Sequence, residues 1–234
     1  RNMNYIRSME IENSYRNILK WGDKREEAVD RRMITLIKEK FGITDDELKK
    51  KHLPGTEEVR LEKPSLLKPS HLDFLRSVCG SDNVLVDDFS RARWSCGKFY
   101  GELLDLRLGQ VPDPPDAVVA PRSHEEVGKI VEFCSAEKIA IIPAGGQSSV
   151  TGALRAPHGG IALDLARHLN RIVEINRVNK TVRVEAGIMG PAFEEELNRH
   201  GYSCGHFPQS FEYSTVGGWI SARGAGQAST GYGK

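Results

Sequence analysis

The sequence lacks the features typical of membrane, secreted and metal-stabilised proteins. No apolar run in its 234 residues approaches the ~18 residues expected of a membrane-spanning helix, and the polar N-terminus contains no signal-peptide core. Only four cysteines occur, with no Cys-x-x-Cys pair and no histidine at zinc-finger spacing. We therefore expect no membrane span, no metal site and a cytoplasmic location. We expect reduced, buried or half-buried thiols at Cys79, Cys96, Cys134 and Cys204.

The chain also lacks an excess of charge of either sign. Its 33 basic and 32 acidic side chains nearly cancel, so the overall charge gives no reason to expect nucleic acid or an anionic membrane as partner. The segment Ser90–Tyr100 mixes cations with aromatic residues, a combination that can bind single-stranded nucleic acid. Because it holds only three cations, we interpret it as a solvated or interface loop and expect no nucleic-acid partner.

Residues 1–110 predict a helical N-terminal extension followed by a linker. A capping box at Asp23 opens an amphipathic helix that runs to Gly42. A proline-rich linker follows, and Ser70 then caps a further helix that ends at Gly80.

Beyond the prolines that precede residue 117, the pattern becomes regular. Ala117–Ala120 predicts a buried strand, a capping box at Ser123 opens an amphipathic helix, and Ile139–Ile142 predicts a second strand. Strand, helix, strand favours a parallel pair joined by a right-handed crossover. Open sheets of this kind bind ligands at the carboxyl ends of their strands.

A glycine-bearing loop comes directly after this second strand, in the sequence Pro143-Ala-Gly-Gly-Gln-Ser-Ser149. Glycine permits positive φ and close approach of a ligand, so consecutive N–H groups can converge on an anion, and the serines add hydroxyl donors. The loop matches neither a Walker loop nor a Gly-x-Gly-x-x-Gly dinucleotide fingerprint. A phosphate-binding loop and an ordinary Gly-Gly turn both remain open from these residues alone.

The following segment predicts a mixed α+β unit. Ile161–Leu165 is a candidate strand, and Arg171–Ile175 pairs plausibly with Thr181–Ala186 across an asparagine-containing turn. A helix begins at Gly190-Pro191 and ends at Gly201.

A second glycine cluster spans His206–Trp219 and continues through Arg223–Gly226. Its small residues allow backbone to lie against a flat ligand, and the neighbouring aromatic side chains can shield that ligand from water. A mobile glycine-rich loop is the alternative. The interleaved large apolar residues disfavour it, because flexible linkers contain little besides glycine and serine.

Taken in order, these motifs resemble flavoproteins of the vanillyl-alcohol oxidase type, which carry a PCMH-type FAD-binding domain. The motifs are Pro-Asp-Ala-Val-Val-Ala-Pro from Pro115, Ile-Pro-Ala-Gly-Gly-Gln-Ser-Ser, Val-Glu-Ala-Gly, and Glu-Tyr-Ser-Thr-Val-Gly-Gly-Trp. Within that group the segment from Gly205 to Arg223 is most similar to the alkyldihydroxyacetonephosphate synthase family. The resemblance covers residues 85–234 well and the first 80 residues loosely.

The resemblance implies an α+β fold with a two-lobed FAD-binding domain at residues 111–234. That domain is incomplete at its C-terminal end, and the C-terminal substrate domain of the family is absent from this chain. Arg223 is expected to supply a fixed positive charge, with a plain surface arginine as the alternative. The implied FAD-binding residues are Pro143, Ala144, Gly145, Gly146, Gln147, Ser148, Ser149, Gln209, Ser210, Glu212, Tyr213, Ser214, Thr215, Gly217, Gly218, Ala222, Arg223, Gly224 and Ala225.

One departure from the family pattern concerns the link to the flavin. Some relatives attach FAD covalently through a histidine in the first loop, whereas this chain has Gln147 there, so we expect non-covalent FAD. His124 and His206 lie outside that loop and are interpreted as structural. The family's acid and base groups belong to the missing domain, so no catalytic residue is assigned.

The resemblance leaves three hypotheses for function. The first is an alkyldihydroxyacetonephosphate synthase-like enzyme of ether-lipid synthesis, in which flavin N5 attacks acyl-dihydroxyacetone phosphate and a fatty alcohol replaces the acid. The second is an FAD-dependent 2-hydroxy acid dehydrogenase or oxidase, like glycolate oxidase or D-lactate dehydrogenase. The third is a flavin-binding half that is inactive alone. A small-molecule or lipid-like substrate is expected, and a homodimer is one option for assembly.

Overall fold

The computed structural model describes residues 12–19, 30–49 and 55–233. Its helices are α1 (Tyr15–Leu19), α2 (Arg31–Phe41), α3 (Asp45–Lys49), α4 (Pro69–Cys79), α5 (Asp88–Arg93), α6 (Tyr100–Arg107), α7 (His124–Glu137), α8 (Gly190–Arg199), α9 (Val216–Ala222) and α10 (Ser229–Tyr232). Its strands are β1 (Val84–Leu85), β2 (Ala117–Val119), β3 (Ile141–Ala144), β4 (Ile161–Asp164), β5 (Ile172–Asn176) and β6 (Thr181–Val184). The chain is α+β, as the sequence predicted.

A four-stranded sheet forms the first lobe, with strand order β1-β2-β4-β3. β2 and β3 are each parallel to β4, and β1 is antiparallel to β2. The prediction that the strands near residues 117–120 and 139–142 pair directly is therefore wrong, because β4 lies between them. All four residues of β4 are buried, because its place inside the sheet lets the chain cover both of its faces. Local periodicity predicts that a strand forms but does not specify which strands become its neighbours.

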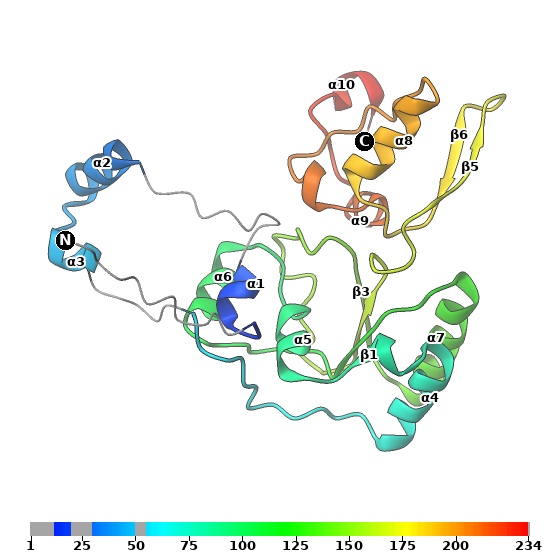
Figure 1. Cartoon of the computed structure of the whole chain (residues 1–234), viewed down its shortest axis with the longest axis horizontal. Helices are drawn as coiled ribbons and strands as arrows, with labels where there is room; N and C mark the ends of the chain where they lie inside the picture. Colours follow the sequence, from blue (N-terminus) through cyan, green and yellow to red (C-terminus); the bar gives the residue numbers. More distant parts are fainter. Residues whose placement is uncertain (1–11, 20–29, 50–54, 234) are drawn as a thin grey trace, which may run out of the picture.

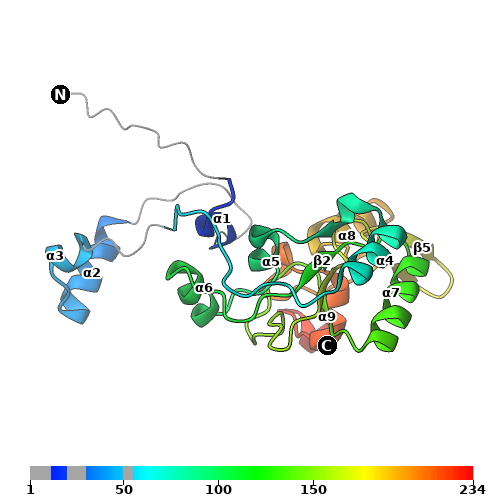
Figure 2. The ribbon, with the colours of Figure 1, turned by 90° about the horizontal axis from the view of Figure 1, so that it is seen from below.

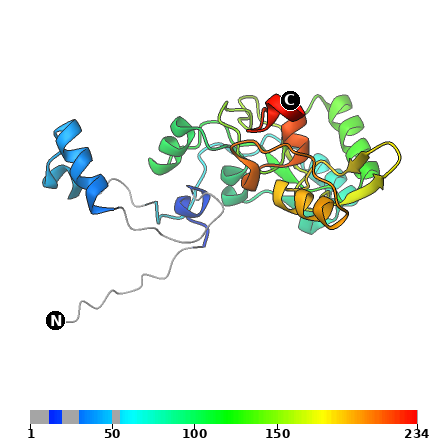
Figure 3. The same cartoon turned by 90° about the horizontal axis from the view of Figure 1, so that it is seen from above.

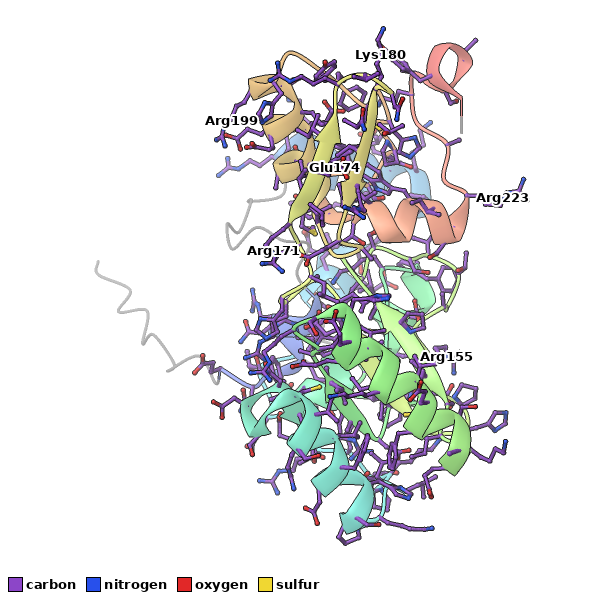
Figure 4. The ribbon with its side chains drawn as sticks, turned by 90° about the vertical axis from the view of Figure 1, so that its right-hand side faces the viewer. Arg155, Arg171, Glu174, Lys180, Arg199 and Arg223 are labelled. Atoms are coloured by element: carbon purple, nitrogen blue, oxygen red, sulfur yellow. The ribbon has the colours of Figure 1, made fainter. Side chains whose placement is uncertain are left out.

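Alternate residues of these strands enter two separate cores. On one face α4 and α7 pack over the sheet (Figures 1 and 4), and the strand residues beneath them include Val119, Ile161 and Leu163. The other face buries Val118 and Ala162, whose neighbours include Trp94 and Leu154. This two-residue alternation is the geometry of a pleated strand.

The second lobe is built on the hairpin of β5 and β6, which confirms the predicted pairing of residues 171–175 with 181–186. α8 and α9 pack against the hairpin and bury Phe193, Leu197 and Trp219. α8 begins at Gly190 and stops just before Gly201, whose φ of +77° suits glycine. This lobe lies above the sheet lobe in Figure 1 and is seen from above in Figure 3.

In the N-terminal part, the observed helices differ from those predicted from the sequence in where they begin. The predicted helix start at Asp23 lies outside the described residues; α2 is capped by Asp30, whose side chain accepts from the backbone N–H of Arg32. α2 has no buried residue, and with α3 it lies to one side of the ribbon (Figure 2). α4 begins at Pro69 rather than after Ser70, since proline already has the φ angle of the first helical turn.

α4 and β1 belong to the same core as β2 and β4, although they precede residue 111. The predicted boundary at residue 110 therefore does not coincide with a boundary of the hydrophobic core. The Asp116 carboxylate ties the preceding linker to the sheet lobe. It accepts the Leu66 N–H at 2.8 Å and the Gly160 N–H at 2.6 Å.

The segment interpreted as a solvated or interface loop, residues 90–100, is largely buried. Residues 90–93 belong to α5. The Arg91 guanidinium donates to the carbonyl oxygens of Pro115 and Lys63 inside the protein. Its aromatic Trp94 lies in the sheet core. The interpretation as a solvated loop was wrong, because these side chains hold the linker and the sheet together.

Three of the four thiols are buried, as predicted, and all four are unpaired; the fourth, in Cys204, belongs to an exposed residue. Burial is the main reason that the pKa values of the Cys79, Cys96 and Cys134 thiols rise to about 11.

Candidate FAD-binding site

The first glycine loop begins where β3 ends, at Ala144. β2, β4 and β3 are parallel, so their carboxyl ends meet at one edge of the sheet, and the loop leaves from that edge. Ala144 lies opposite Asp164, the last residue of β4. The loop therefore occupies the place where open α/β sheets bind ligands.

The two glycine-bearing segments lie against each other. A Cβ built on Gly145 would lie 2.3 Å from Thr215 Oγ1, and one built on Gly146 would lie 2.1 Å from the carbonyl oxygen of Tyr213. Such distances are far below van der Waals contact. Glycine is required at both positions because the second segment occupies the space that a side chain would fill.

The structure corrects the expected use of glycine in this loop. Neither Gly145 nor Gly146 has positive φ; the left-handed conformation falls on Gln147, with φ +56°, and on Gly152, with φ +72°. A left-handed residue within such a loop turns successive N–H groups toward a common point. The Gln147 side chain itself turns aside, and its Nε2 donates to the carbonyl oxygen of Arg93 at 2.6 Å.

Five consecutive backbone amides of this loop are free to bind a ligand. Within the described ranges of the chain, no group accepts a hydrogen bond from the N–H groups of residues 145–149. All five residues are half-buried. Consecutive unpaired amide donors are suited to binding a diphosphate, so these residues fit the phosphate part of a dinucleotide.

Hydrogen bonds fix the second segment within its own lobe. The Ser214 hydroxyl donates to the Ser210 carbonyl and accepts from the Trp219 indole N–H at 2.6 Å. Thr215 caps α9 through the Gly218 N–H. Gly190 donates to the Ser214 carbonyl oxygen, which anchors the segment to α8. A ligand held between the two segments would therefore meet a preformed wall.

Comparison with known proteins identifies this arrangement. A family described as "FAD binding domain" matches residues 115–234, which include both glycine-bearing segments. The chain belongs to this FAD-binding domain family. Its cofactor is FAD, as the resemblance implied.

The FAD-binding chain is also similar to named enzymes. Alkyldihydroxyacetonephosphate synthase of Trypanosoma brucei brucei is 36% identical over 195 residues, which are 80% of this chain and 32% of that protein. A solved alkyldihydroxyacetonephosphate synthase matches with a TM-score of 0.71 and 33% identity, covering 75% of this chain and 33% of that one. D-2-hydroxyglutarate dehydrogenase of Escherichia coli (strain K12) is 37% identical over 123 residues, 51% of this chain and 12% of that protein.

These similarities confirm the vanillyl-alcohol oxidase type resemblance and the synthase branch within it. The FAD-binding chain spans about a third of the length of the synthases it matches.

Only some of the residues predicted for the FAD site contact the first glycine loop. Gly145 and Gly146 lie against Tyr213, Ser214 and Thr215, while Gly217 packs on Ala186 of the second lobe. Gly224 contacts Trp219 and His206. The exposed residues of the set are Pro143, Gln209, Glu212, Gly218, Ala222, Arg223 and Ala225.

Arg223 adopts a left-handed backbone, with φ +49°, and its side chain extends away from both lobes in Figure 4. A role for Arg223 in holding phosphate stays a prediction.

Two features of the site escaped the sequence analysis. Gly97 lies so close to the loop that its Cβ would be 2.1 Å from the Ser149 carbonyl oxygen, and the Lys98 N–H donates to that oxygen at 2.7 Å. The signal was the glycine inside the segment interpreted as a solvated loop. The second feature is the buried Asp164 carboxyl, whose pKa is raised by burial although the N–H groups of residues 166 and 167 partly offset this.

The remaining expectations concern histidines, metals and membranes. The His206 ring packs on Trp219 at 4.9 Å between centroids, and its buried Nε2 has no hydrogen-bond partner within the described chain. Among the described residues, no three acidic, histidine or cysteine side chains are arranged to hold a metal ion. None of the described helices is both long and apolar enough to span a bilayer.

Proposed function

We propose that this chain is the FAD-binding part of an alkyldihydroxyacetonephosphate synthase-like enzyme, which exchanges an acyl for an alkyl group on dihydroxyacetone phosphate. The extent of similarity supports this proposal. The match to the synthase is longer than the FAD-binding region itself and so includes residues before Pro115. The match to the 2-hydroxy acid dehydrogenase is only about as long as that region.

In the proposed enzyme the two segments have different tasks. The N–H groups of residues 145–149 and the Ser148 hydroxyl bind the diphosphate, while the backbone at Ser214 and Thr215 lines the flavin side. Bound FAD supplies the reactive ring at which the exchange takes place. The packing of Gly146 on Tyr213 holds the two segments side by side, so that both can contact one nucleotide. The substrate is lipid-like. The acid and base groups of the enzyme come from a further domain.

The proposed cofactor linkage is non-covalent. The residue at the attachment position of covalent relatives is Gln147, whose amide is not an effective nucleophile and is occupied by the Arg93 carbonyl. Acid precipitation of the FAD-loaded protein tests this, and the yellow colour is expected in the supernatant. Colour that stays in the pellet contradicts the proposal.

Binding of FAD to the 234-residue chain is the direct test of the site. FAD should raise the midpoint of thermal unfolding, by an amount that grows with its concentration, because a ligand selective for the folded state stabilises it. The matched control is riboflavin, which lacks the diphosphate and should give a much smaller rise. Equal rises with both compounds would contradict diphosphate binding by residues 145–149.

A dehydrogenase of 2-hydroxy acids is the second candidate, since such an enzyme shares the FAD-binding region. The complete protein separates the two. Incubated with acyl-dihydroxyacetone phosphate and a labelled fatty alcohol, it should form labelled alkyl product, and anaerobic D-lactate or glycolate should leave its visible flavin band intact. Bleaching of that band with no labelled product would support the dehydrogenase instead.

Three finer expectations belong to this proposal. We infer that the 234-residue chain alone turns over little or no substrate, because it spans only about a third of the synthases it resembles. A cytoplasmic location and a homodimer stay predictions, which cell fractionation and the mass of the native particle would test.

A further inference from the structure

The first glycine loop is tied to the rest of the protein by a segment that precedes the family domain. The Gln147 side chain donates to the Arg93 carbonyl oxygen at 2.6 Å, and the Ser149 carbonyl oxygen accepts the Lys98 N–H at 2.7 Å. In the part of the chain that the structure describes, no other hydrogen bond joins residues 145–149 to residues outside the loop. Arg93 and Lys98 both precede the region that the FAD-binding domain family matches.

Gly97 shows how closely this segment approaches the loop. A Cβ built on Gly97 would lie 2.1 Å from the Ser149 carbonyl oxygen and 3.0 Å from the carbonyl carbon. Both atoms belong to the backbone, which cannot rotate away as a flexible side chain would. Any side chain at position 97 would therefore displace Ser149, whose N–H is the last of the five amides that face no acceptor in the described chain.

Residues 93–98 are themselves packed into two cores. Trp94 is buried in the same core as Ala144, the last residue of β3. Cys96 is buried in a different core together with Ile18 of α1, and the Lys98 Nζ donates to the Ile18 carbonyl oxygen at 3.1 Å. Because close-packed cores resist displacement, residues 93–98 form a firm support for a loop that contains no helix or strand.

The loop needs support because one of its residues has an unfavourable backbone conformation. Gln147 has a φ of +56°, in the left-handed region that residues other than glycine rarely occupy. The bond from its side chain to the Arg93 carbonyl oxygen holds the residue in that conformation. A loop held in one arrangement loses less freedom when it binds a ligand, so its donors bind more tightly.

We propose that residues 93–98 are positioning residues of the FAD site, which hold the amides of residues 145–149 in the arrangement that the diphosphate requires. This inference rests on the function proposed above, since it concerns the same nucleotide. It gives the site a part that lies outside the family domain. A change at position 97 should therefore weaken the binding of the diphosphate and leave the binding of the flavin ring unchanged.

Gly97→Ala tests the proposal, with Gly101→Ala as its matched control. Gly101 lies in α6, and its Cβ would be 2.8 Å from the exposed Phe99 ring, which can rotate away. Titration followed by flavin fluorescence gives the dissociation constants of FAD and of riboflavin, which lacks the diphosphate. Gly97→Ala should raise the constant for FAD about 5- to 150-fold and change that for riboflavin less than about twofold. Gly101→Ala should leave both constants unchanged.

The outcomes separate this inference from the proposed function. Equal FAD dissociation constants in Gly97→Ala and its control would overturn the inference and leave FAD binding intact. A rise for riboflavin as large as that for FAD would also overturn it, because the whole site would then be distorted. If the natural chain binds FAD no more tightly than riboflavin, the proposed diphosphate site fails and this inference fails with it.

Hydrogen exchange of the natural chain gives a second measurement, which applies even if Gly97→Ala does not fold. The Lys98 N–H is released when Ser149 moves away, so FAD at tenfold excess over its dissociation constant should slow its exchange about tenfold. The control is the Gly80 N–H, which donates to the Arg76 carbonyl oxygen at the end of α4 and should exchange at an unchanged rate. Unchanged exchange at Lys98, or equal slowing at Lys98 and Gly80, overturns the proposal.

Discussion

Replacement of Gly146 by alanine tests how closely the two FAD-binding segments must approach. The new Cβ would lie 2.1 Å from the Tyr213 carbonyl oxygen and 2.9 Å from the Ser214 Cα. Ordinary contacts begin near 3.4 Å, so the segments must separate by about 1.3 Å. The obstacle is backbone, which cannot rotate away as a flexible side chain would.

Overpacking of this kind costs about 1–3 kcal/mol, which lowers the unfolding midpoint of a chain of this size by roughly 2–12 °C. If the same free energy is lost from FAD binding, the dissociation constant rises by about 5- to 150-fold. Urea or thermal unfolding measures the first effect, and quenching of flavin fluorescence on titration measures the second.

Gly128→Ala is the matched control, because Gly128 lies within α7 and its Cβ would meet no atom within 4 Å in the described part of the chain outside the backbone of its own helix turn. Alanine there should stabilise the helix by about 0.5–1 kcal/mol and leave FAD affinity unchanged. If Gly146→Ala unfolds and binds FAD as Gly128→Ala does, the two segments are not in contact in the working protein and the reasoning fails.

Three other predictions follow from buried polar groups. Asp116→Asn leaves one acceptor oxygen for the two N–H groups, of Leu66 and Gly160, that the Asp116 carboxylate accepts. The free energy of unfolding measured in urea should therefore fall by about 1–3 kcal/mol, whereas the control Asp73→Asn, at an exposed residue, should leave it unchanged. Ser214→Ala leaves the buried Trp219 indole N–H without an acceptor; a similar loss and a shift in tryptophan emission are expected, and an unchanged midpoint would contradict the bond. The three buried thiols ionise near pH 9 when unfolded but near pH 11 when folded, so the unfolding free energy should fall as pH rises between these values, by at most about 2.7 kcal/mol per thiol. Cys134→Ala should make that fall shallower, and an equal slope would count against the shift.

Much of the local structure could be predicted from the sequence, because its determinants lie within a few residues of each other. Ser123 does accept the Glu126 N–H at the start of α7, although the Glu126 carboxylate turns to the Arg122 N–H instead of completing the box. The hairpin and the helix that ends before Gly201 were predicted for the same reason. The order of motifs was also sufficient to identify the flavoprotein type.

Long-range packing could not be predicted in this way. Periodicity indicates that residues 161–165 form a strand, but the place of β4 between β2 and β3 depends on which strand has both faces covered by the rest of the chain. The segment around Arg91 reads as a polar loop because its charges are visible in the sequence, while the carbonyl oxygens that bind them come from distant residues.

The sequence by itself determined that two glycine-bearing segments exist, that each follows a regular element, and that their order is that of an FAD-binding domain. The tertiary structure alone decided what the glycines do: Gly145 makes room for the Thr215 side chain and Gly146 for the backbone of Tyr213 and Ser214, while Gln147 takes the left-handed conformation. It also decided that Glu102 is buried with no hydrogen-bond partner for its carboxylate among the described residues. The physical reason is that φ preferences and caps act between near neighbours, whereas close approach and burial depend on residues far apart in the chain.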